Sequence, residues 1–70
     1  MLVTAKATDL DALRLRSEFL DMPGLIINAL QAARLLDVRV YRANALLVEL
    51  ASEGFLIQLA NGAYRRTAGA

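Results

Sequence analysis

Residues 32–66 read AARLLDVRVYRANALLVELASEGFLIQLANGAYRR, and this stretch decides the fold. Apolar residues recur at helical spacing on both sides of Asp37, a residue type that tolerates the left-handed backbone of a tight turn. Gly54 is suited to end the second of these helices, and Asn61-Gly62 is typical of a two-residue type I′ turn between strands. The predicted order is therefore helix, tight turn, helix and two-stranded hairpin.

Start and stop signals extend this order toward the N-terminus. Thr8, followed three residues later by Asp11, predicts the N-cap of a first helix that ends near Asp21. Pro23 then interrupts the helical hydrogen bonds because it has no backbone N–H. Residues 25–27 favour a short extended segment, which would add a short third strand to the hairpin.

The two helices around Asp37 have clear expected limits. Asn28 and Gln31 have the spacing of a capping box, which predicts a helix over 29–36. The next helix is expected over 40–53.

The hairpin is expected to have strands over 55–60 and 63–66. A two-residue turn at its tip sets the register of the strands. The expected cross-strand pairs are Leu59 with Tyr64, Gln58 with Arg65 and Ile57 with Arg66.

Helical spacing also predicts which faces are buried. The expected core stripe of the third helix is Ala43, Leu46, Leu47 and Leu50. The expected core stripe of the first helix is Leu10, Leu13, Ser17 and Leu20. A further apolar stripe of the first helix is expected to face away from the core and contains Ala12, Leu15 and Phe19.

Length and composition indicate one domain over residues 1–70, mainly α with a small β-hairpin. Residues 1–7 and 67–70 are expected to be flexible. The chain is 57% hydrophobic and 21% charged, which is more apolar side chain than one small core readily buries. A partner is therefore expected to cover part of the surface.

Charge and chemistry narrow the function classes. With a net charge of +1, the chain has little long-range attraction for a polyanion. It has no His and no Cys, and Ser17 and Ser52 lack a nearby general base in the sequence, so we expect no enzyme, cofactor, metal site or small-molecule substrate. No secretory signal or membrane-spanning run is visible, which predicts a cytoplasmic protein without a membrane partner.

The chain resembles the winged helix-turn-helix family, particularly its small bacterial members. The resemblance covers about residues 10–66 and rests on FLDMPGL at 19–25, QAARLL at 31–36, GFL at 54–56, and Gly62-Ala63-Tyr64 with Arg66. It implies a transcriptional regulator that places its third helix in the major groove of double-stranded DNA. The residues implied in base contacts are Arg39, Tyr41, Arg42 and Asn44, and those implied in phosphate contacts are Arg65 and Arg66.

The surfaces that would meet DNA are, however, unusually apolar. Tyr41, Ala45 and Val48 form a second stripe on the third helix, opposite its core leucines, and such a stripe suits another helix. The expected protein interface consists of Tyr41, Ala45, Val48, Leu15, Phe19, Ile57 and Leu59.

Three interpretations stay open. We favour a divergent or engineered module that forms a homo-oligomer, most simply a dimer. The alternatives are a DNA-binding regulator and an enzyme, and the missing His, Cys and general base argue against the enzyme. For the arginines and apolar residues singled out above, a plain surface role without any partner is the competing explanation.

Overall fold

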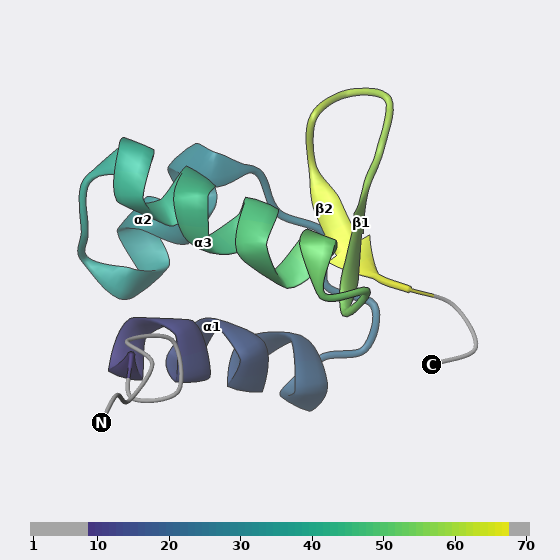
Figure 1. Ribbon diagram of the computed structural model, residues 1–70, viewed down its shortest axis with the longest axis horizontal. Coiled ribbons are helices and arrows are strands. Elements are labelled where there is room, and N and C mark those ends of the chain that lie inside the picture. Colours follow the sequence, from purple (N-terminus) through teal and green to yellow (C-terminus); the bar gives the residue numbers. More distant parts are fainter. Residues whose placement is uncertain (1–8, 68–70) are drawn as a thin grey trace.

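The structure, a computed structural model, describes residues 9–67 and confirms three helices followed by a two-stranded antiparallel hairpin (Figure 1). The helices are α1 (Leu10–Asp21), α2 (Ala29–Leu36) and α3 (Val40–Ser52), and the strands are β1 (Leu56–Gln58) and β2 (Tyr64–Arg66). This order of elements is consistent with a winged-helix-like topology. None of the helices in the described range is long and apolar enough to cross a membrane.

The limits of α2 and α3 follow the local signals in the sequence. The Asn28 side chain accepts the Gln31 N–H at 2.9 Å, and the Gln31 side chain accepts the Asn28 N–H at 2.8 Å, which confirms the capping box. Asp37 adopts the left-handed conformation with φ 58°, as expected for the tight turn. Ser52 is the last residue of α3, one earlier than expected, and Gly54 follows with φ 86°.

The start of α1 differs from the expectation. Its N-cap is Asp9 rather than Thr8, which lies outside the described residues. The Asp9 carboxylate accepts the backbone N–H groups of Asp11 at 3.0 Å and Ala12 at 3.2 Å. A carboxylate at this position satisfies two unpaired N–H groups and also interacts favourably with the helix dipole, so it is a better cap than the hydroxyl before it.

The ends of the chain were expected to be flexible over 1–7 and 67–70, and most of these residues lie outside the described range. Thr67 is described, and it is tied to the fold. Its backbone N–H donates to the Phe55 carbonyl at 3.1 Å, and its hydroxyl donates to the Gly54 carbonyl at 3.1 Å. The ordered hairpin therefore extends one residue further than expected.

The hairpin register is shifted by one residue from the prediction. The observed pairs are Leu56 with Arg66, Ile57 with Arg65 and Gln58 with Tyr64, rather than Ile57 with Arg66, Gln58 with Arg65 and Leu59 with Tyr64.

The cause of the shift is the loop at the tip of the hairpin. The Leu59 N–H donates to the Ala63 carbonyl at 2.7 Å, which leaves a three-residue loop in place of the expected two-residue turn. Gly62 has φ 90°, but Asn61 is not left-handed, whereas a type I′ turn needs positive φ at both central residues. Instead, the Asn61 side chain accepts the Ala63 N–H at 3.0 Å and stabilises the longer loop.

The face that α1 turns to the core is the opposite of the one predicted. Leu15 and Phe19 are fully buried, while Leu10, Leu13 and Leu20 are exposed. Because both faces of α1 are apolar, hydrophobicity alone does not choose between them. The choice follows from tertiary contacts, including the edge-to-face contact of Phe19 with Phe55, whose ring centroids are 6.4 Å apart.

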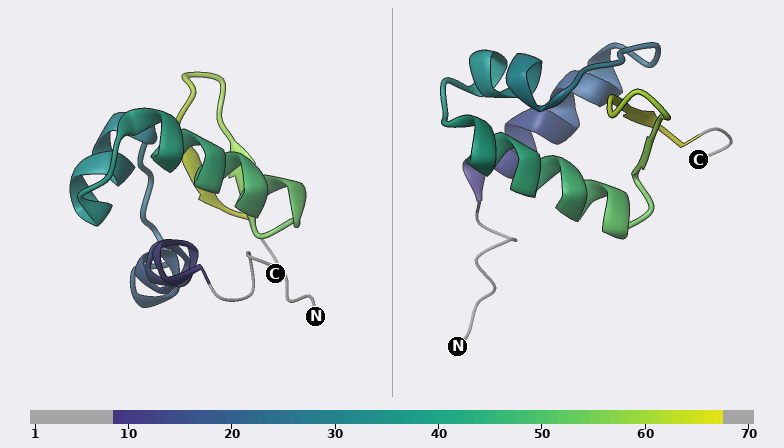
Figure 2. Two further views of the ribbon diagram at one scale, coloured as in Figure 1. Left: turned by 60° about the vertical axis from the view of Figure 1, so that its left-hand side comes forward. Right: turned by 90° about the horizontal axis from the view of Figure 1, so that it is seen from above.

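The core lies between α1, the α2–α3 pair and the base of the hairpin (Figure 2). Its members from α3 confirm the predicted stripe of Ala43, Leu46, Leu47 and Leu50. The other buried apolar residues in the cluster are Leu15, Phe19, Ile27, Ala32, Ala33, Leu36, Leu56 and Tyr64. The tip of the hairpin points away from α1 (Figure 1).

The expected third strand is reduced to one bridging residue. Ile27 forms an isolated antiparallel bridge with Tyr64, in which each residue donates its N–H to the carbonyl of the other, at 3.1 and 2.8 Å. This bridge ties the connection between α1 and α2 to β2.

Candidate interaction surfaces

The outer face of α3 is apolar and exposed. Tyr41 is 75% exposed and Val48 is 48% exposed, and Ala45 lies exposed between them. These three residues lie on the opposite side of α3 from the buried leucines, as their spacing predicts. The geometry therefore leaves this part of the expected interface open to a partner.

Arg42 lies close to the same surface and is partly exposed, but its guanidinium is held by carboxylates of the same chain. Its Nη2 lies 3.0 and 2.9 Å from the two carboxylate oxygens of Asp9, and its Nε lies 3.3 Å from the Asp11 carboxylate. These ion pairs join α3 to the N-terminal end of α1. A guanidinium with two carboxylate partners has few N–H groups left for a base or a phosphate.

The electrostatics of this cluster favour the charged forms of its groups. The hydrogen bonds that Arg42 donates to Asp9, followed by the one that it donates to Asp11, raise the pKa of Arg42. Partial desolvation raises the pKa of the Asp9 carboxyl, but hydrogen bonds from the Ala12 N–H and from Arg42 outweigh it, so this pKa lies below its ordinary value. Asp9 and Arg42 are therefore both charged at neutral pH.

Two other residues implied in base contacts remain accessible. Arg39, the N-cap of α3, and Asn44 within α3 are exposed, and neither side chain makes a hydrogen bond within the described range. Arg39 also lines a shallow depression at the tight turn, together with Arg34 and Asp37. These donors are sufficient for a small polar contact surface.

The two arginines of β2 are directed toward the protein itself. The Arg65 Nη1 donates to the Arg66 carbonyl at 3.2 Å, and the Arg66 guanidinium lies 5.2 Å from the ring centroid of Phe55. Arg16 of α1 lies over the same ring at 4.5 Å and forms an ion pair with Glu53 at 2.7 Å. The cations near the hairpin therefore contribute to contacts between α1, the end of α3 and β2.

The apolar residues of the hairpin are less exposed than those of α3. Ile57 is an exposed residue of β1, while Leu59 is half-buried next to the loop. Of the two residues expected at an interface here, Ile57 is the more accessible.

The two interface residues expected on α1 are not on the surface. Leu15 and Phe19 are buried in the core of a single chain, so the expectation that they contact a partner was wrong. Their place on the surface is taken by Leu10, Leu13 and Leu20, for which helical spacing predicts a place in the core. Two apolar stripes on one helix were visible in the sequence, but nothing local indicates which of them is buried.

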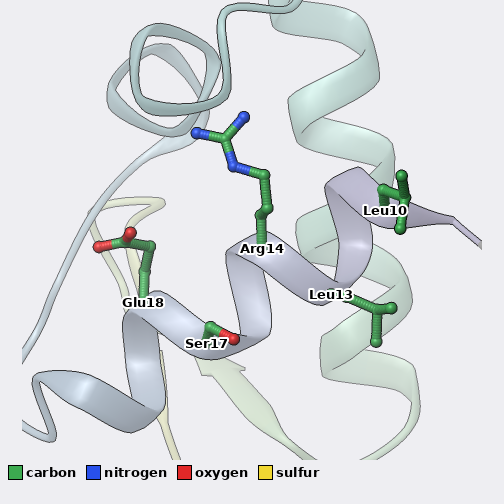
Figure 3. Close-up of a pocket in the computed structure, with 5 residues that line it drawn as sticks. All are labelled: Leu10, Leu13, Arg14, Ser17 and Glu18. Atoms are coloured by element: carbon green, nitrogen blue, oxygen red, sulfur yellow. The ribbon is translucent and has the colours of Figure 1, made fainter.

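Figure 3 shows part of this outer face of α1. Leu10, Leu13, Arg14, Ser17 and Glu18 line a shallow, open groove on it. Arg14 and Glu18 point to one side of the helix and Leu13 to the other, with Ser17 between them.

The described residues form no group of three or more side chains suited to binding a metal ion. No polar or charged residue of residues 9–67 is buried in the core. The exposed surface of the described structure therefore combines apolar faces with charged and amide side chains, among them Asp21, Arg39 and Asn44.

Comparisons with known proteins add no family to this description. No protein-family model matches the chain, and no curated protein or solved structure matches it.

Proposed function

We propose that this chain is a non-enzymatic, winged-helix-like module that associates with a second copy of itself through the outer face of α3. The observation that carries the proposal is the exposure of Tyr41, of which 75% is accessible at the first turn of α3. A tyrosine ring contributes a large contact area to an interface and loses little conformational entropy there. Ala45 and Val48 continue the same face, and Ile57 adds an exposed apolar residue on the hairpin.

The charges near α3 support association more than DNA binding. Arg42 is paired with Asp9 and Asp11, and Arg66 is directed toward Phe55. The chain carries a net charge of only +1. Because affinity for DNA depends largely on neutralising phosphates, these arrangements weaken that interaction and leave an apolar one intact.

The test is sedimentation over a concentration series at low and high salt, with wild type and Val48→Glu compared. Assemblies of the wild type are expected to persist at high salt because burial of apolar surface is not screened. Val48→Glu would bury an unpaired carboxylate at this contact, so it is expected to weaken that contact while leaving the helical content unchanged.

The matched control is Leu30→Glu, at a position on α2 with the same 48% exposure as Val48. It introduces the same charge on another face and is expected to leave the assembly unchanged. Equal assembly of the Val48→Glu and wild-type proteins would contradict the proposed contact.

Binding to double-stranded DNA is the second candidate, favoured by the exposure of Arg39 at the N-terminal end of α3, Asn44 on α3 and Arg34 on α2. Arg pairs with guanine and Asn with adenine in the major groove. This function predicts an electrophoretic mobility shift with random duplex at low salt that Arg39→Ala weakens. The absence of any shift would reject it.

A further inference from the structure

The exposed leucines of α1 have the spacing of a helix-pairing seam. Leu10, Leu13 and Leu20 are 72%, 47% and 49% exposed. Together with Ser17 they follow one another at intervals of three, four and three residues, which is the a, d, a, d pattern of a two-stranded coiled coil. This seam lies on the opposite side of α1 from the buried pair Leu15 and Phe19.

The helix that carries the seam is already formed and fixed within one chain. Leu15 and Phe19 anchor it in the core, Asp9 caps it, and Arg42 holds its N-terminal end. Isolated helices of this length are marginal in water, and a pair of them would have to supply the free energy of helix formation. Here the contacts of α1 within its own chain already stabilise the helix, so a short seam is sufficient to pair the α1 helices of two copies.

The charges beside the seam distinguish the two possible orientations of a paired helix. In the heptad assignment that places Leu10 at position a, Asp9 and Arg16 occupy g positions, and Arg14 and Asp21 occupy e positions. In a parallel pair, a g residue faces the e residue five positions later on the other helix. Asp9 then faces Arg14 of the second copy, and Arg16 faces Asp21. Within each chain Asp9 is already paired with Arg42 and Arg16 with Glu53, so the contacts of a parallel pair extend these ion pairs with a further group of opposite charge.

In an antiparallel pair, the residues that face each other beside the seam carry charges of the same sign. Aligning Leu10 with Leu20 of the other helix sets Arg14 beside Arg14 and Arg16 beside Arg16. Contacts between like charges are unfavourable, and here they would occur on both sides of the seam.

We propose that a second copy of this chain docks on α1, with the two α1 helices parallel and with Leu10, Leu13, Ser17 and Leu20 of each facing their counterparts. The contact is isologous, since the same surface of each copy is used around a two-fold axis. It is separate from the outer face of α3, so it goes beyond the proposed function and does not depend on it. A chain that uses both contacts forms assemblies larger than a dimer.

The first test isolates α1 by using Val48→Glu as the background, which weakens the α3 contact. Sedimentation of this variant over a concentration series is expected to show a dimer, and the added Leu13→Glu substitution is expected to shift it to monomer at the same concentrations. Leu30→Glu in the same background is the control, because Leu30 has a similar exposure but lies on α2.

The outcomes separate the two proposals. A Val48→Glu protein that is monomeric at every concentration overturns the α1 contact. A wild-type assembly that Val48→Glu leaves unchanged and Leu13→Glu dissolves supports the α1 contact while rejecting the α3 contact. Circular dichroism of each variant checks that the helices remain formed.

The second test concerns orientation. The chain has no native cysteine, so Ser17→Cys introduces a single thiol. In the parallel pair this thiol meets its own counterpart, and mild oxidation is expected to give a covalent dimer rapidly. In the antiparallel alignment Ser17 faces Leu13, and a disulfide would form only between Ser17→Cys and Leu13→Cys proteins. Leu30→Cys measures the background from random collisions, and a Ser17→Cys yield no higher than this background overturns the parallel arrangement.

Discussion

Arg42 joins the first turns of α3 to the N-terminal end of α1 through two carboxylates. Asp9 has a double role in this cluster, because its carboxylate also caps α1 through the N–H groups of Asp11 and Ala12. The three charged side chains are partly exposed, so water screens their attraction and the ion pairs contribute modestly to stability. Their main effect is on placement, since they fix the end of α1 against α3.

Acid should weaken this cluster. The pKa of Asp9 in the folded protein lies below its ordinary value of 3.8, so the stabilisation that it provides is complete above that value and is lost as the pH falls through the folded pKa. We therefore expect Asp9→Asn, which keeps a capping oxygen, to be less stable than the wild type at pH 7, and we expect this difference to shrink as the pH falls below 3.8. Urea denaturation at low protein concentration measures this difference as a function of pH.

The matched control for this substitution is Asp21→Asn, because Asp21 is exposed and makes no ion pair within the described range. It is expected to change stability little over the same pH range. A constant difference between Asp9→Asn and wild type from pH 7 to 2 would contradict the role assigned to the Asp9 charge.

At the scale of elements, the rotation of α1 determines which of its two apolar stripes is core and which is surface. Leu13 and Leu15 are two positions apart in sequence, yet Leu15 is fully buried and Leu13 is nearly half exposed. The contact between Phe19 and Phe55 and the pairing of Arg42 with Asp9 both act on this rotation from elsewhere in the fold. The same leucine type therefore has different roles on the two faces of one helix.

The rotation of α1 predicts that Leu15→Ala and Leu13→Ala differ strongly in their effect on the free energy of unfolding. Leu15→Ala removes buried side chain and leaves a cavity, so we expect the free energy of unfolding to fall by about 2 to 5 kcal/mol. Leu13→Ala is expected to change it by less than about 0.5 kcal/mol. Urea denaturation at concentrations where the chain is monomeric measures both, and equal losses would mean that the faces of α1 are assigned wrongly.

For the molecule as a whole, the sequence predicts what is determined within a few residues. The capping box at Asn28 and Gln31, the left-handed Asp37 and the end of α3 before Gly54 are all local, and the structure confirms them. The core stripe of α3 was also predictable, since only one of its faces is rich in leucine. Its opposite face, with Tyr41, was therefore predictable as surface.

The errors concern features that depend on distant partners or on fine loop geometry. The two carboxylates that hold Arg42 lie 31 and 33 residues away in sequence. No residue near Arg42 in the sequence therefore indicates that its N–H groups are already bonded within the chain. The rotation of α1 depends on Phe55, which belongs to the other end of the chain. The hairpin register changed because Asn61 uses its side chain, rather than a left-handed backbone, in the loop.

Association should also be visible in the stability of the whole molecule. A folded assembly that dissociates on unfolding is stabilised by mass action, so its melting temperature rises with protein concentration. We expect this rise for the wild type and its absence for the double variant Val48→Glu with Leu13→Glu. Calorimetry across a hundredfold range of concentration measures the effect, and a wild-type melting temperature independent of concentration would contradict self-association by either contact.

The bridge between Ile27 and Tyr64 has a consequence for how the chain reaches its fold. It joins a segment just after α1 to the last strand, so the loop it closes contains α2, α3 and β1. During synthesis from the N-terminus, all three helices leave the ribosome before the residue that Ile27 must pair with. Closing the sheet is therefore a late event, because a nascent chain that ends before Tyr64 contains the residues of all three helices but lacks the strand that the sheet needs.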